Sequence, residues 1–269
     1  MKGRMIALAT VVGTLVFGAI WELAVRVFDV REFELLAPSK IVTELRTRPR
    51  FYFDASLVTG RHAILGLVLA LGVALVLGAI LSTSRFVEQA AQPVLILILV
   101  SPWVGYFTSI VARFGSGDPP VIILATLVSV PAFTFATVTG LRSADAAARE
   151  LLASVNASRG EVLWRLRLPS ALPNILSTSR YVIGLSLAAA YYGEGGNLKT
   201  DGLGAIGRRA ASNSQGRLLW ASVFATALLG VVGLGTVAAL ERILLRWHVS
   251  QRRGSPTSGA ARSRRRLLP

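Results

Sequence analysis

The sequence of 269 residues contains no cysteine. A disulfide framework, a thiol nucleophile and a Cys-based metal site are therefore excluded, and so is a lipid-anchored binding protein, which needs an acylated cysteine. Charged residues are also scarce, at 16%, whereas 53% of the residues are apolar. This balance is too apolar for a soluble domain of this length, and it indicates a membrane protein.

Groups that could support catalysis or bind a metal are equally sparse. The two histidines, His62 and His248, lie at opposite ends of the chain without a carboxylate at metal-ligand spacing. Because no nucleophile, base and metal ligand form a constellation, we expect a non-enzymatic protein without a cofactor. The string from Gly193 to Thr200 is similar to a phosphate-binding loop, but Leu198 replaces the second glycine of that loop and an apolar segment precedes it in place of a strand. We therefore interpret it as a glycine-rich turn and not as a nucleotide site.

The basic residues outnumber the acidic ones, which gives a formal net charge of +15. In a soluble protein this charge would suggest nucleic-acid binding. Here most Lys and Arg stand between apolar blocks or in the C-terminal tail. We therefore expect a lipid bilayer, and no nucleic acid, as the partner of this charge.

Six segments approach the roughly 20 apolar residues that a helix needs to cross a bilayer. They are Met5–Val27, His62–Ser82, Pro93–Ala112, Pro119–Leu141, Pro173–Gly193 and Leu218–Leu240. The sequence thus predicts an all-α, polytopic membrane protein with about six transmembrane helices. The first segment is too long for a signal peptide and lacks a cleavage pattern, so we interpret it as an uncleaved span. The fifth carries Arg180 and ends beside Glu194, and it could instead be re-entrant or line a cavity.

Arg and Lys residues in the segments that flank the spans, including both terminal segments, set the expected orientation. Their distribution favours cytoplasmic N- and C-termini, although the segments on the opposite side are also basic. The predicted organisation is a first span (1–27), an external linker (28–61), a core domain (62–248) with a cytoplasmic segment (142–170), and a basic tail (249–269) of disordered composition.

The cytoplasmic segment 142–170 is the one long polar stretch on the predicted inner side, and its pattern predicts two short helices. Residues Ala146 to Val155 are rich in helix formers and would make the first helix. Asn156 stands at the junction, where its short amide side chain tolerates a left-handed backbone.

The second short helix is predicted from Arg159 to Leu166. Ser158 followed by Glu161 forms a capping-box pattern at its start. Pro169 and Pro173 are expected to stop this helix and to redirect the chain toward the membrane.

The segment resembles the cytoplasmic signature of permeases from binding-protein-dependent importers. That signature reads Glu-Ala-Ala, three residues, Gly, nine residues, Ile, one residue and Leu-Pro. The same spacing occurs here at Glu150, Leu151, Leu152, Asn156, Leu166, Leu168 and Pro169. Leu replaces both Ala and the Ile, and Asn replaces the Gly.

In the family this segment forms a coupling helix that sits in a cleft of the ATPase subunit. The resemblance implies contact with an ATPase by Glu150, Asn156, Ala157 and Ser158. It implies packing on the chain's own helices by Leu166, Leu168 and Pro169. On the residues alone, an amphipathic helix lying in the membrane interface is the alternative.

The strings Leu36–Ser39, Phe114–Gly117 and Gly202–Gly204 are similar to the nitrate, sulfonate and taurine branch of these permeases, which includes permeases for vitamin precursors. The resemblance implies the permease subunit of an ABC importer in a bacterial inner membrane, moving a small polar solute. The implied partners are two ATPase subunits, a second permease copy as a homodimer, and an extracytoplasmic binding protein. The alternative is a self-sufficient secondary transporter or channel, which would need intramembrane coupling residues such as Arg180 and Glu194.

Polar side chains in the third and fifth predicted spans are candidates for a translocation path. These residues are Ser101, Tyr106, Ser109, Tyr181, Ser186 and Glu194. Tyrosines at span ends also form interfacial belts, and Glu194 fits either a path or the outer membrane boundary.

Overall fold

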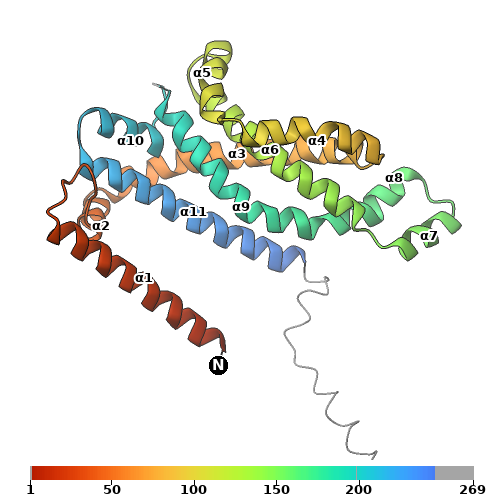
Figure 1. The fold of residues 1–269 in the computed structure, drawn as a ribbon, viewed down its shortest axis with the longest axis horizontal. Coiled ribbons are helices and arrows are strands. Elements are labelled where there is room, and N and C mark those ends of the chain that lie inside the picture. Colours follow the sequence, from red (N-terminus) through yellow and green to blue (C-terminus); the bar gives the residue numbers. More distant parts are fainter. Residues whose placement is uncertain (1, 198, 246–269) are drawn as a thin grey trace, which may run out of the picture.

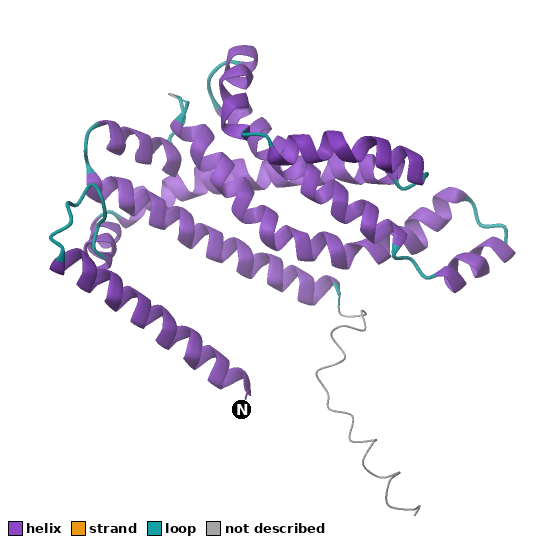
Figure 2. Ribbon diagram, viewed as in Figure 1, coloured by secondary structure: helices purple, strands orange, loops and turns teal. Residues whose placement is uncertain are grey.

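The computed structural model describes residues 2–197 and 199–245, and within these residues it contains helices and no strand (Figures 1 and 2). This confirms the predicted all-α class. The helices are α1 (Lys2–Val27), α2 (Pro38–Thr47), α3 (Pro49–Leu81), α4 (Arg85–Val100), α5 (Trp103–Phe114), α6 (Asp118–Arg142), α7 (Ala146–Ser154), α8 (Arg159–Val162), the π-helical turn η1 (Leu163–Arg167), α9 (Leu168–Gly195), α10 (Leu203–Ser212) and α11 (Gly216–Leu244). The predicted tail 249–269 lies outside the described residues.

Four of the described helices are long and apolar enough to cross a membrane: α1, α3, α6 and α11. The pair α4 and α5 adds a fifth if it is taken as one span. Helix α9 contains the predicted fifth span without interruption, but it does not meet the same test of length and composition. The count of six spans therefore stays a prediction.

The predicted third span, Pro93–Ala112, falls on two helices and not on one, and whether the pair crosses the membrane as one span stays a prediction. Helices α4 and α5 meet at an angle of 90°. The break falls at Ser101, which is extended because it precedes Pro102 and the proline ring disfavours the helical region there. Pro93 does not open a helix either, because α4 already begins at Arg85 with Ser84 as its cap.

Small residues bring α3, α6 and α9 together at the centre of the bundle. A Cβ atom added at Gly66 of α3 would lie 2.5 Å from the Cβ of Ala125, and one added at Gly140 of α6 would lie 2.6 Å from the Cα of Ala171. Such close approach lets helices gain dispersion contacts where lipid supplies no hydrophobic driving force. The three helices thereby form a closely packed core.

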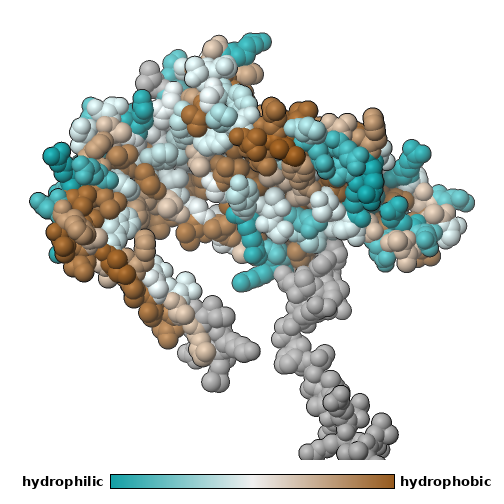
Figure 3. Space-filling view, viewed as in Figure 1, coloured by the Kyte–Doolittle hydropathy of each residue, from teal (hydrophilic) through white to brown (hydrophobic). Residues whose placement is uncertain are grey.

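Helix α1 lies apart from this core, as Figure 1 shows. Its apolar side chains are exposed along its length, for example Phe17 at 66% and Ile20 at 63%, and Figure 3 shows the resulting hydrophobic surface. It reaches the bundle near its C-terminal end, where the Trp21 ring lies 5.3 Å from that of Phe224. The outer faces of α1 are therefore available to lipid or to another chain.

The two ends of the bundle differ. Helices α7 and α8 project at one end, whereas α2 and α10 lie at the other (Figure 1). The predicted linker 28–61 contains α2 and the first turns of α3, which begins at Pro49. In this linker Glu32 pairs with Lys40 and Arg217, and their hydrogen bonds lower the pKa of Glu32 to about 2.

Candidate functional site

The segment between α6 and α9 begins with α7, which the sequence predicted almost to the residue. The Asp145 side chain accepts a hydrogen bond from Ala147 N at 3.1 Å and so caps the helix. At the other end Asn156 has φ of 53°, which confirms the predicted left-handed backbone. Ala157 N donates to Leu152 O at 2.9 Å and closes the turn. The reversal of the chain after α7 is therefore fixed by local hydrogen bonds.

Helix α8 starts with the predicted capping box. Glu161 N donates to Ser158 Oγ at 3.2 Å, and Ser158 N donates to Glu161 Oε2 at 2.9 Å. The hydrogen bonds from Ser158, followed by the charge of Arg165, lower the pKa of the Glu161 carboxyl group. The ionised carboxylate therefore holds the start of α8.

The expectation that Pro169 and Pro173 stop the second helix is wrong. Helix α8 ends at Val162, but the chain continues through η1 into α9, which contains both prolines. The wider π-helical turn makes this possible: Leu168 N donates to Leu163 O, five residues back. Pro169 then falls in the first turn of α9, where a missing N–H costs little. The second short helix and α9 are consequently one continuous rod.

The surface of α7, α8 and η1 is open, since every residue in these elements is at least partly exposed. Among the signature positions, Glu150, Asn156 and Ser158 are exposed and Ala157 is half-buried. The half-buried positions include Leu152, Leu166, Leu168 and Pro169, and Leu168 packs on the central core. Apolar side chains are exposed at Leu151 (68%), Val155 (66%) and Trp164 (72%). This division agrees with the expected roles, which stay predictions.

The candidate path residues differ in how far they are buried. Ser186 and Glu194 are fully buried, and Ser186 Oγ donates to Ala63 O at 3.0 Å. The other four are partly or fully exposed on the single chain: Ser101, Tyr106, Ser109 and Tyr181. A path through these residues stays a prediction.

Glu194 lies in a buried polar cluster at the end of the bundle opposite α7. Its Oε1 atom is 2.8 Å from His62 Nδ1, and its Oε2 atom accepts from Thr59 Oγ1 at 2.8 Å and from Gly204 N at 2.9 Å. His62 Nε2 is 3.1 Å from Asp118 Oδ1. Glu194, His62 and Thr59 are all 0% exposed. The carboxylate therefore joins α3, α9 and α10.

The cluster also caps α10. The cap residue of this helix is Gly202, which has no side chain to receive the first N–H groups. Thr59 and Glu194 take that role from other helices, because Leu203 N donates to Thr59 Oγ1 at 2.9 Å and Gly204 N donates to Glu194. A Cβ added at Gly202 would lie 2.2 Å from the Glu194 carboxylate, so glycine is required for this approach.

The comparisons with known proteins agree with this arrangement. Residues 66–246 match the family described as the binding-protein-dependent transport system inner membrane component. The chain belongs to this family. It is 30% identical to the formylaminopyrimidine transport permease of Halalkalibacterium halodurans, over 93% of this chain and 100% of that one. It is 25% identical to the taurine transport system permease of Escherichia coli, over 88% and 89% of the two chains.

Solved structures show the same fold. A methionine ABC transporter in an inward-facing conformation matches with a TM-score of 0.58 at 15% identity, covering 72% of this chain and 97% of that chain. An amino acid ABC transporter matches with a TM-score of 0.58, also at 15% identity, covering 77% and 98%. The chain is thus the transmembrane permease subunit of an ABC importer, a multi-pass membrane protein and a non-enzymatic subunit.

Sequence reasoning missed part of the buried cluster of this permease. It gave His62 no role, and it did not single out Thr59 or Asp118. Glu194 was noticed, and the structure shows that its side chain is buried among other helices. No local sequence pattern could reveal this cluster, because its members are far apart along the chain: His62 and Glu194 are separated by 132 positions. Gly202 and Gly204 were the only local sign of this site, because glycine is often required where another group approaches the backbone closely.

Proposed function

We propose that this permease transmits the movement of a separate ATPase to its transmembrane helices through the segment from α7 to η1, hereafter the coupling segment. The observation that carries the proposal is the continuity of α8, η1 and α9. A force applied to α8 moves α9 directly, since no flexible loop intervenes, and α9 packs on α3 and α6 in the core.

The exposed face of the coupling segment supplies a contact surface for the ATPase. Leu151, Val155 and Trp164 are largely exposed, and the capping residues hold the surrounding turns in place. We place this end of the bundle in the cytoplasm together with both termini, because the two terminal segments, Arg85 and the arginines from Arg142 to Arg167 together outnumber the basic residues on the opposite side.

The remaining partners follow from the family and its relatives. We propose two ATPase subunits, a second permease copy in a homodimer, and an extracytoplasmic binding protein that delivers the solute. The solute is a small polar molecule, a class that includes the formylaminopyrimidine and taurine named for the two relatives. Measuring which ligands the companion binding protein retains would identify it.

Single cysteines test the coupling contact cleanly, because the natural sequence has none. We expect Ala153→Cys on α7 and Ala157→Cys to crosslink to the co-purified ATPase with a short thiol reagent. Ser212→Cys in α10, at the opposite end of the bundle, is the matched control and should not react with the ATPase. If neither coupling-segment variant crosslinks, or if the purified permease alone transports solute in liposomes, the proposal is wrong.

A further inference from the structure

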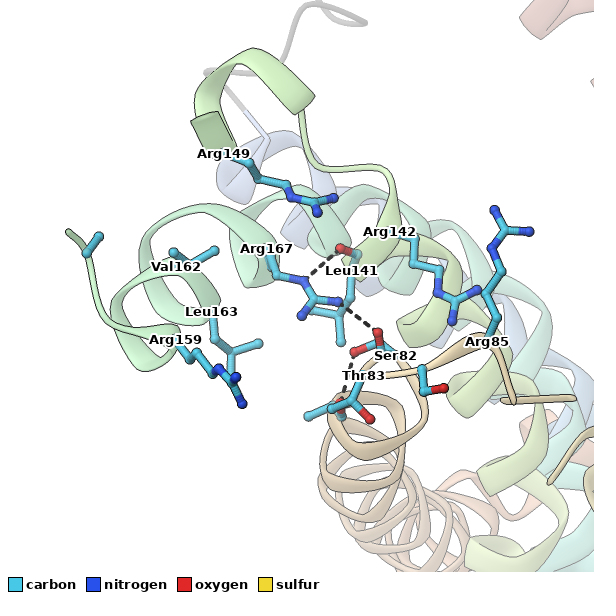
Figure 4. Close-up of a pocket in the computed structure, with 13 residues that line it drawn as sticks. Ser82, Thr83, Arg85, Leu141, Arg142, Arg149, Arg159, Val162, Leu163 and Arg167 are labelled. Carbon is cyan, nitrogen blue, oxygen red and sulfur yellow. Dashed lines mark hydrogen bonds between the residues drawn. The ribbon is translucent and has the colours of Figure 1, made fainter. Parts of the chain in front are cut away.

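A cavity of about 760 Å³ lies between the coupling segment and the turn that joins α3 to α4 (Figure 4). Five arginines line it: Arg85, Arg142, Arg149, Arg159 and Arg167. Three hydroxyl residues of the turn complete the polar part of the lining: Ser82, Thr83 and Ser84. Figure 4 shows Arg149, Arg159 and Arg167 approaching this space from the coupling segment.

The positive charge of this cavity is only partly balanced. No acidic residue is part of its lining. Arg142 pairs with Glu88 of α4. Within the part of the chain that the structure describes, Arg85, Arg149 and Arg159 form no ion pair. At least three guanidinium groups are therefore available to a ligand.

Arg167 holds the inner wall of the cavity. Its Nε donates to Leu141 O at 3.1 Å and its Nη2 donates to Ser82 O at 3.4 Å, so it ties the coupling segment to α3 and α6. Burial, followed by the charges of Arg149 and Arg142, lowers the pKa of Arg167. The same repulsion between arginines would be relieved by an anion bound among them.

The lining indicates which anion fits. Guanidinium groups bind phosphate oxygens well because each presents several N–H donors in a planar fork. The cavity also has apolar walls from Ala79, Leu141, Val162 and Leu163. It lies directly after the last residue of α3, where an apolar membrane helix ends. A phosphate joined to an apolar body, at the height of a lipid headgroup, matches all three features.

We propose that this cavity binds the headgroup phosphate of an anionic phospholipid and so joins the coupling segment to the turn between α3 and α4. Lipid binding in this cavity does not depend on the proposed contact with the ATPase. Its consequence for transport rests on the proposed coupling function, since a bound lipid would stiffen the segment that contacts the ATPase.

Thermal unfolding of the full-length purified permease in a neutral detergent tests the site without the ATPase. The probes are short-chain phosphatidylglycerol, short-chain phosphatidylcholine and inorganic phosphate. We expect phosphatidylglycerol to raise the unfolding temperature at concentrations where the other two have no effect. Equal stabilisation by phosphatidylcholine, or by inorganic phosphate, overturns the assignment to an anionic lipid.

The double variant Arg149→Gln/Arg159→Gln should raise the phosphatidylglycerol concentration for half-maximal stabilisation about twenty-five-fold, since each arginine contributes roughly a fivefold effect. Arg165→Gln is the matched control: this arginine lies on the same segment, is 73% exposed, pairs with Glu161 and does not line the cavity. Equal responses of wild type and double variant overturn the proposal. If only the proposed coupling function is wrong, the cysteine variants will not crosslink to the ATPase, but phosphatidylglycerol will still stabilise the permease.

Discussion

Replacing Glu194 by Ala should destabilise the permease more than any exposed substitution. The change removes the partner of three hydrogen bonds, with Thr59, His62 and Gly204, and leaves these three groups in a site that is 0% exposed at Glu194. Breaking a buried acid–imidazole pair by deleting one partner costs about 3–5 kcal/mol. For a domain of this size the unfolding temperature falls roughly 2–4 °C per kcal/mol, so we expect a decrease of about 6–20 °C.

The assay is unfolding in detergent followed by intrinsic tryptophan fluorescence, for which the chain supplies five tryptophans. Glu194→Gln preserves the shape and one acceptor oxygen, so it should cost less, about 1–2 kcal/mol. Asp54→Ala, at an exposed acid on α3, is the control and should change the unfolding free energy by less than about 0.5 kcal/mol. An unfolding temperature for Glu194→Ala within 2 °C of the wild type, that is under about 1 kcal/mol, would refute the view that this carboxylate holds the helices together.

Two further predictions concern the same end of the bundle. Gly204→Ala would place a Cβ 1.8 Å from Tyr191 O, so we expect a loss of folded protein in size-exclusion chromatography, and a normal yield would show that α10 can shift. Glu32 has a pKa lowered to about 2 by Arg217 and Lys40, so its contribution to stability is fully present above its unfolded pKa and is lost as pH falls toward 2. The difference in unfolding temperature between wild type and Glu32→Gln should therefore be constant near neutral pH and shrink between about pH 5 and 2. A difference that does not change over this range would contradict the view that Arg217 and Lys40 stabilise the ionised Glu32.

The sequence by itself determined the class of the protein and the local structure of its coupling segment. Apolar runs of membrane length require helices, because lipid offers the backbone no hydrogen-bond partner. The capping box of Ser158 and Glu161 and the left-handed Asn156 were also predictable, since the interacting groups lie within a few positions of one another. The spacing from Glu150 to Pro169 pointed to the family to which the chain belongs.

The tertiary structure decided the features that depend on packing. Pro169 was expected to end a helix, but a π-helical turn lets the rod continue, and the packing of η1 and α9 against the core accommodates that turn. The buried pair of Glu194 and His62, with the partly exposed Asp118 beside it, joins residues from distant helices, and so does the arginine-lined cavity. Local sequence patterns do not reveal these contacts between distant residues. The contacts form only when small residues let α3, α6 and α9 approach closely, and this packing fixes which side chains face one another.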